Sequence, residues 1–169
     1  IYNTQDLLLI PQGTFISPEV AAVVYANKLK KPLEECLRFE DEFDSIRLQE
    51  HFIAIMQQDD LLTALNEHQD IATTLKNYIS TYDNFPLLKQ KITVMALTMP
   101  ELFLRTIYCS WFALLIAKEM RFSEQGCADV FLAALSHDIG MLHLNAFVLE
   151  KKEDLSPDDW RHIQEHVLI

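Results

Sequence analysis

The chain has 169 residues, of which 50% are hydrophobic and 23% are charged, a balance typical of a globular protein with a packed core. It contains only three glycines and six prolines, and because all-β folds need many turns, this scarcity favours helices. The net charge of -11 disfavours binding to the phosphate backbone of DNA or RNA. An anionic ligand would need a local cation, such as a metal ion or an arginine.

Residues 1–44 are expected to form a small N-terminal α/β module, because their pattern differs from that of the rest of the chain. The apolar stretch 6–10 is followed by the turn signal Pro11–Gly13 and then by the short, β-prone stretch 14–16. This order predicts a β-hairpin at the start of the chain.

A helix is predicted over about 18–29. Ser17 is a typical N-cap, and Pro18 is a typical first residue of a helix, because proline has no backbone N–H to leave unsatisfied there. The acidic run 34–42 that follows is interpreted as a solvated face and not as a metal site.

Residues 45–98 are expected to form a helical connector, with helices at about 46–57, 59–67, 69–81 and 84–96. An exposed apolar face on this connector would pair two copies of the chain into a homodimer. The connector and the module before it would then serve as a sensory or dimerising segment.

Residues 99–169 are predicted to form a third segment, in which a long helix over about 100–120 begins at a proline. Ser123 is the expected N-cap of the next helix, about 124–137. Ser156, followed by a proline and two acidic residues, starts the last helix. The fold class expected for the whole chain is therefore mainly α.

The cysteines are odd in number, widely spaced and without a CxxC pair, which predicts reduced thiols and a cytoplasmic location. They are Cys36, Cys109 and Cys127. No apolar run is expected to cross a membrane, and the run 107–117 is broken by Cys109 and Ser110. The chain starts without Met or a basic signal region, so we expect a piece of a longer protein.

His137 and Asp138 are the first candidates for chemistry, because they follow an apolar helix that would bury them. Gly140 permits a turn that brings both side chains toward one point. Buried charge needs a partner, and an imidazole with a carboxylate would suit a divalent ion of Fe, Mn, Zn or Ni. An isolated His-Asp pair is a weak indication of a metal site, so the surrounding sequence has to decide whether a metal site is predicted.

The context is the run His137–Met141, then an irregular stretch, then a proline-started helix in which His166 stands six residues after Trp160. This order resembles the HD superfamily and, within it, the HD-GYP branch, over about residues 100–169. The resemblance implies an HD-type helical bundle, here preceded by the hairpin-containing module.

The HD-GYP resemblance also implies a centre of two or three divalent metal ions that hydrolyses phosphodiester bonds, usually those of cyclic di-GMP. By position, His137, Asp138 and His166 would be metal ligands, and Asp138 would also take part in catalysis by bridging two ions. A metal-bound hydroxide would attack the phosphate, and the cations would stabilise the charge that develops.

Two positions depart from the family pattern. The family's first ligand, a His early in the preceding long helix, corresponds to Arg105, which cannot donate a lone pair to a metal. Its guanidinium would instead pair with Asp138. The lysine that follows the HDIG motif, which helps to bind the substrate phosphate, is Met141 here. The remaining family motifs would lie beyond Ile169, so the HD-GYP-like segment 99–169 is expected to be incomplete at its C-terminus.

Different positions are predicted for two further histidines. His143 is expected in a loop near the site, where it would contact a ligand or be a simple loop residue, and His162 is expected at the surface. The favoured hypothesis is a degenerate HD-GYP-like domain that acts by regulation or by binding a signalling partner. The alternatives are an active phosphodiesterase for cyclic di-GMP or another nucleotide, and an HDOD-like interaction domain without metal chemistry.

Overall fold

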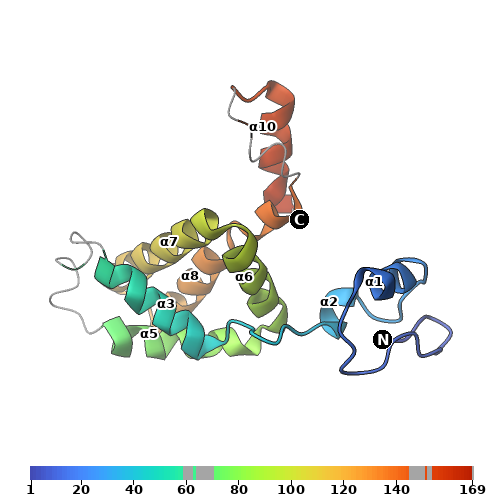
Figure 1. Ribbon diagram of the computed structural model, residues 1–169. Coiled ribbons are helices and arrows are strands. Elements are labelled where there is room, and N and C mark those ends of the chain that lie inside the picture. Colours follow the sequence, from blue (N-terminus) through green and yellow to red (C-terminus); the bar gives the residue numbers. More distant parts are fainter. Residues whose placement is uncertain (59–62, 64–70, 145–150, 152–153, 169) are drawn as a thin grey trace. The chain divides into compact units, whose positions relative to one another are not determined.

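The computed structural model describes residues 1–58, 63, 71–144, 151 and 154–168. The chain divides into two compact units, Ile1–Glu40 and Asp41–Ile169. Helices make up most of the described second unit, and the first unit holds two short ones (Figure 1), so the prediction of a mainly α fold is confirmed. The predicted division at residues 44 and 98 stays a prediction.

The first unit contains two short helices, α1 (Pro18–Tyr25) and α2 (Leu33–Cys36). The predicted start of α1 is confirmed, because the Ser17 hydroxyl accepts a hydrogen bond from the backbone N–H of Val20 at 3.3 Å. The helix ends four residues earlier than the pattern suggests. A turn and a bend follow the helix, and Leu29 then forms an isolated antiparallel bridge with Asn3.

The predicted β-hairpin of 6–10 with 14–16 is not found, and the part of this unit that the structure describes contains isolated bridges in place of strands. The chain reverses earlier, at Asn3, whose side-chain oxygen accepts hydrogen bonds from the backbone N–H groups of Gln5 and Leu7 at 3.0 and 2.9 Å. An asparagine that bonds its own backbone in this way is a strong turn former. The chain therefore reverses at Asn3, before the turn that was predicted at Pro11–Gly13.

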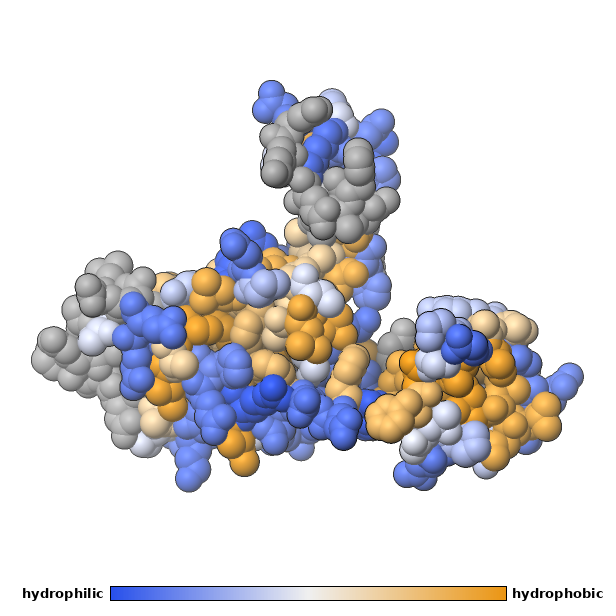
Figure 2. Space-filling view, viewed as in Figure 1, coloured by the Kyte–Doolittle hydropathy of each residue, from blue (hydrophilic) through white to orange (hydrophobic). Residues whose placement is uncertain are grey.

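Apolar side chains remain at the surface of the first unit. Phe15 and Tyr25 are each 82% exposed, and Figure 2 shows hydrophobic surface gathered over this unit, at the right of the view. Exposed apolar surface of this kind is common at interaction sites.

The described part of the second unit consists mainly of helices. They are α3 (Ser45–Gln58), α5 (Ile71–Ile79), η1 (Ser80–Asn84), α6 (Pro86–Thr98), α7 (Pro100–Glu119), α8 (Glu124–Ser136), η2 (Ile139–His143), α10 (Pro157–Gln164) and η3 (Glu165–Leu168). Most predicted helices agree with these bounds to within two residues. The helix predicted at 59–67 falls on residues of which the structure describes only Thr63.

Helix α7 is central to the second unit, where it packs against α6 and most extensively against α8 (Figure 1). Ile107, Trp111 and Leu114 are fully buried along one side of α7, at the spacing of a helical face. They meet Phe131 and Leu135 of α8, which are equally buried. This packing fixes the C-terminal end of α8, where His137 and Asp138 follow.

Among the described helices, α7 is the one that is long and apolar enough to cross a membrane, judged by length and composition. The central helix of a packed bundle has the same composition, and Trp111 and its buried neighbours place α7 in such a core. The prediction that the chain has no membrane span stays a prediction.

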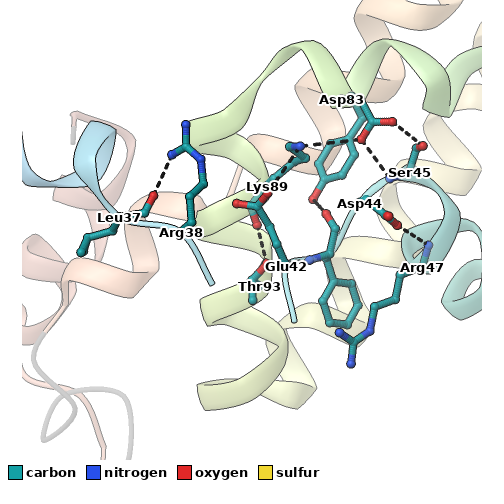
Figure 3. A network of polar contacts seen from close by, with 11 residues as sticks. Leu37, Arg38, Glu42, Asp44, Ser45, Arg47, Asp83, Lys89 and Thr93 are labelled. Atoms are coloured by element: carbon teal, nitrogen blue, oxygen red, sulfur yellow. Dashed lines mark hydrogen bonds and ion pairs between the residues drawn. The ribbon is translucent and has the colours of Figure 1, made fainter. Parts of the chain in front are cut away.

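The segment before α3 is held to α6 and η1 by a network of polar contacts (Figure 3). The backbone N–H of Phe43 donates to the Thr93 hydroxyl at 3.0 Å, and the Tyr82 hydroxyl donates to the Phe43 carbonyl at 2.9 Å. The ammonium of Lys89 lies 3.4 Å from a carboxylate oxygen of Glu42. Both polar groups of the buried Phe43 backbone are therefore satisfied, which fixes the entry of the chain into the bundle.

Candidate functional site

His137 and Asp138 lie where α8 ends and η2 begins. Asp138 leaves the helical conformation, with φ −106° and ψ 11°, so its side chain turns toward that of its neighbour. His137 Nε2 lies 3.1 Å from Asp138 Oδ2. The two side chains therefore face one point, as the sequence predicts for a helix end.

The Asp138 carboxylate is the centre of the site. Asp138 is only 6% exposed, and a buried carboxylate is costly unless cations or hydrogen-bond donors surround it. Arg105 of α7 places Nη2 2.5 Å from Asp138 Oδ2. His166 of η3 places Nε2 3.5 Å from the other oxygen, Oδ1.

The sequence-predicted pair between Arg105 and Asp138 is thus present. A guanidinium is always charged, and its bond to a carboxylate is a charge-assisted one. The side chain of Arg105 as a whole is 57% exposed, although one of its nitrogens reaches the buried carboxylate. The arginine can therefore neutralise Asp138 without being buried itself.

Hydrogen bonds to backbone carbonyls fix the orientation of both imidazole rings. His137 Nδ1 lies 2.7 Å from the carbonyl oxygen of Ala134, and His166 Nδ1 contacts the carbonyl oxygen of Ile163. A carbonyl oxygen can only accept, so Nδ1 carries the proton and donates in each ring. In both rings, Nε2 is then the nitrogen that faces Asp138.

The donor chemistry of His137, Asp138 and His166 suits a divalent metal, and a carbonyl bond to the far ring nitrogen is the usual support of a histidine ligand. Within the described residues, however, no group of three or more His, Cys, Asp or Glu side chains is arranged to hold a metal ion. The Arg105 guanidinium lies on one of the two carboxylate oxygens that a metal would use. In this arrangement, a metal ion could use Asp138 Oδ2 only if the guanidinium moved away.

Met141 and His143 lie in η2, directly after the HDIG motif. Met141 is partly buried and His143 is exposed. His143 Nε2 lies 3.1 Å from the ammonium nitrogen of Lys91, on α6. His162 is exposed on α10, in agreement with the expectation of a surface residue.

Lys91 is a residue of this neighbourhood that sequence reasoning missed. It belongs to the connector, outside the motif, and it reaches η2 only because α6 packs against η2. A single lysine on a predicted helix does not indicate a functional site. Lys91 places a cation beside η2, although the lysine expected one residue after Gly140 is absent.

Comparisons of the chain with protein families, with curated proteins and with solved structures found no match. The assignment to a family therefore stays a proposal that depends on the motif register and on the contacts around Asp138.

Proposed function

We propose that this chain is a signalling domain of the HD-GYP type in which a guanidinium takes the place of a metal ion. The domain would act by regulation or by binding a protein partner, and not by hydrolysis. The observation that carries this proposal is the distance of 2.5 Å between Arg105 Nη2 and Asp138 Oδ2. The order of the HDIG motif, Trp160 and His166 along the chain supports the family.

The electrostatics of the pair favour loss of the metal. Arg105 supplies a permanent positive charge to the buried Asp138 carboxylate, so the carboxylate needs no second cation at that oxygen. A divalent ion at the same oxygen would also face the repulsion of the guanidinium at short range. Binding of a metal would therefore require Arg105 to move away first.

The residue after the glycine of the HDIG motif also argues against phosphodiester hydrolysis. Phosphoryl transfer depends on cations that hold the phosphate and stabilise its developing charge. At this position, the chain has Met141, which offers neither a charge nor a hydrogen-bond donor. A nucleotide would therefore bind more weakly than in an active member of the family.

The residues before the bundle would supply the input to this domain. The first unit exposes large apolar side chains, such as Phe15 and Tyr25, and surfaces of this type mark interaction sites. We propose that this N-terminal segment receives a signal or holds two copies together. Light scattering on the intact chain would test the dimer, and a monomer at all concentrations would remove it.

A turnover assay tests the loss of catalysis. The intact chain would be incubated with cyclic di-GMP and Mn²⁺, Fe²⁺, Ni²⁺ or Zn²⁺, and linear and mononucleotide products would be separated by chromatography. We expect no metal-dependent product above the level of a chain-free control. Metal-dependent hydrolysis that disappears in Asp138→Asn would overturn the proposal.

A substitution at Arg105 tests the specific role of the guanidinium. Arg105→His supplies a lone pair where the family has its first ligand, so it should increase the affinity for Mn²⁺ or Zn²⁺ by tenfold or more, about 1.4 kcal/mol. Arg121→His is the matched control, since Arg121 is exposed and lies after the end of α7. Equal metal affinities in the two variants would argue against a blocking arginine.

A second candidate function is an active metal-dependent phosphodiesterase. It is favoured by the two imidazole rings, whose Nδ1 protons are held by backbone carbonyls so that Nε2 of His137 and His166 faces Asp138. Arg105 would then leave Asp138 and bind the substrate phosphate, helped by His143 and Lys91. The turnover assay separates this candidate from the first.

A further inference from the structure

We infer that Gly140 is a positioning residue, which brings His166 to Asp138 by leaving room for the backbone of η3. A Cβ built on Gly140 would lie 1.8 Å from the carbonyl oxygen of His166 and 2.8 Å from its carbonyl carbon. Both distances are far below van der Waals contact. Any side chain at position 140 would therefore push His166 away.

The glycine is required for space and not for backbone conformation. Among the described glycines, Gly13 has a positive φ of 81°, whereas the φ of Gly140 is not positive. The atoms that a Cβ would meet are backbone atoms of His166, which cannot rotate away as the end of a flexible side chain can. Relief would require the whole of η3 to shift.

This close approach has a direct consequence for the site. With the His166 backbone against Gly140, the His166 ring bonds through Nδ1 to the Ile163 carbonyl and places Nε2 3.5 Å from Asp138 Oδ1. A shift of η3 by even 1–2 Å, the order needed to relieve the overlap, would end this last contact. Arg105 and His137 approach Asp138 from α7 and from the end of α8, so they would keep their positions.

The bundle should tolerate the loss of this approach. The described residues of α10 are not buried, and neither α10 nor η3 contributes a described side chain to the hydrophobic core. Contacts between η2 and η3 are the principal ones that join this end of the chain to the bundle. Gly140 would therefore control the position of His166 and not the folding of the helices before it. This inference does not depend on whether Asp138 pairs with an arginine or with a metal.

The test uses NMR signals of the histidine rings in the intact chain, without added metal. Asp138→Asn serves as the probe, because it changes the group that both His137 and His166 face. In the parent chain, Asp138→Asn should shift the ring signals of both histidines. In a Gly140→Ala background, His137 should keep its response while the response of His166 falls at least threefold. In a Gly126→Ala background, both responses should persist.

Gly126→Ala is a fair control because a Cβ at Gly126 would meet its nearest atom, Ser123 Oγ, at 3.3 Å, which a small adjustment relieves. Gly140→Ser adds the same Cβ as the alanine variant and should give the same result. An unchanged His166 response in Gly140→Ala would overturn the inference. So would loss of cooperative unfolding in that variant, since the inference places the strain in η3 and leaves the bundle intact.

Discussion

The buried carboxylate of Asp138 is bonded by Arg105, a side chain that comes from 33 residues earlier in the chain and lies mostly in solvent. The contact joins the central helix α7 to the end of α8, so it connects the core of the bundle to the candidate site. Its energetic value can be measured separately from any activity.

A double-mutant cycle measures the coupling of the pair. Arg105→Met keeps an unbranched apolar stem but removes the guanidinium, so it should lower the free energy of unfolding by about 1–3 kcal/mol, because a buried carboxylate loses its donor. In an Asp138→Asn background, the same substitution should cost at least about 1 kcal/mol less. Urea unfolding followed by tryptophan fluorescence, to which the buried Trp111 contributes, would report both values.

The control for this cycle is Arg121→Met, which removes an equal charge from an exposed position at the end of α7. It should change stability by less than about 0.5 kcal/mol. Additive effects of Arg105→Met and Asp138→Asn would contradict the pairing that the structure shows.

The entry of the chain into the bundle gives a second prediction. Tyr82→Phe removes the hydroxyl that donates to the Phe43 carbonyl at 2.9 Å and leaves that carbonyl buried without its donor. The free energy of unfolding should fall by about 1–2 kcal/mol. Tyr25→Phe, at a position that is 82% exposed, should have almost no effect. Equal stabilities of the two variants would show that the network in Figure 3 does not fix this segment.

The same tyrosine predicts how stability depends on alkaline pH. Burial, followed by the nearby Glu42 carboxylate, raises the pKa of Tyr82 well above its ordinary value of 10.0. The folded state therefore keeps the proton at a pH at which the unfolded chain releases it. This contribution to stability is complete below pH 10 and is lost as the pH rises above that value. Urea midpoints measured from pH 8 to 11 should fall more steeply in the parent chain than in Tyr82→Phe, and parallel curves would contradict this.

The start of α10 gives a prediction at acidic pH. Asp159 accepts hydrogen bonds from Lys151 and from Ser156, and these bonds hold the pKa of its carboxyl well below the usual 3.8. The carboxylate therefore stabilises the helix start above pH 3.8, and this stabilisation is lost as the pH falls below that value. Hydrogen exchange of the α10 amides at pH 5 should be faster in Asp159→Asn than in Asp158→Asn. Equal rates would contradict a capping role.

Local chemistry explains why several helix starts could be predicted. Ser17, Ser123 and Ser156 each accept a hydrogen bond from a backbone N–H in the first turn of the helix that follows. Such caps depend on residues a few positions apart, so the sequence contains all the information needed. The turn at Asn3 also depends on local contacts, but its pattern was not identified in the sequence. The predicted hairpin was therefore wrong.

Tertiary contacts explain what the sequence left open at the site. The approach of Arg105 to Asp138 was predictable, because the motif register places both residues at the same centre. Lys91 was not, since its position beside His143 follows from the packing of α6 on η2. Gly140 was expected to permit a turn, but its role as a gap for the His166 backbone depends on a segment 26 positions later in the chain, which no local pattern reports.

The metal content of the intact chain tests the central claim most directly. The chain would be purified after expression in medium supplemented with Mn²⁺, Fe²⁺ and Zn²⁺, and its bound metal would be measured by elemental analysis beside that of Arg105→His. The guanidinium on Asp138 predicts far less than one ion per parent chain and a clear gain in the variant. One ion or more per parent chain, lost in Asp138→Asn, would contradict a site in which arginine replaces the metal.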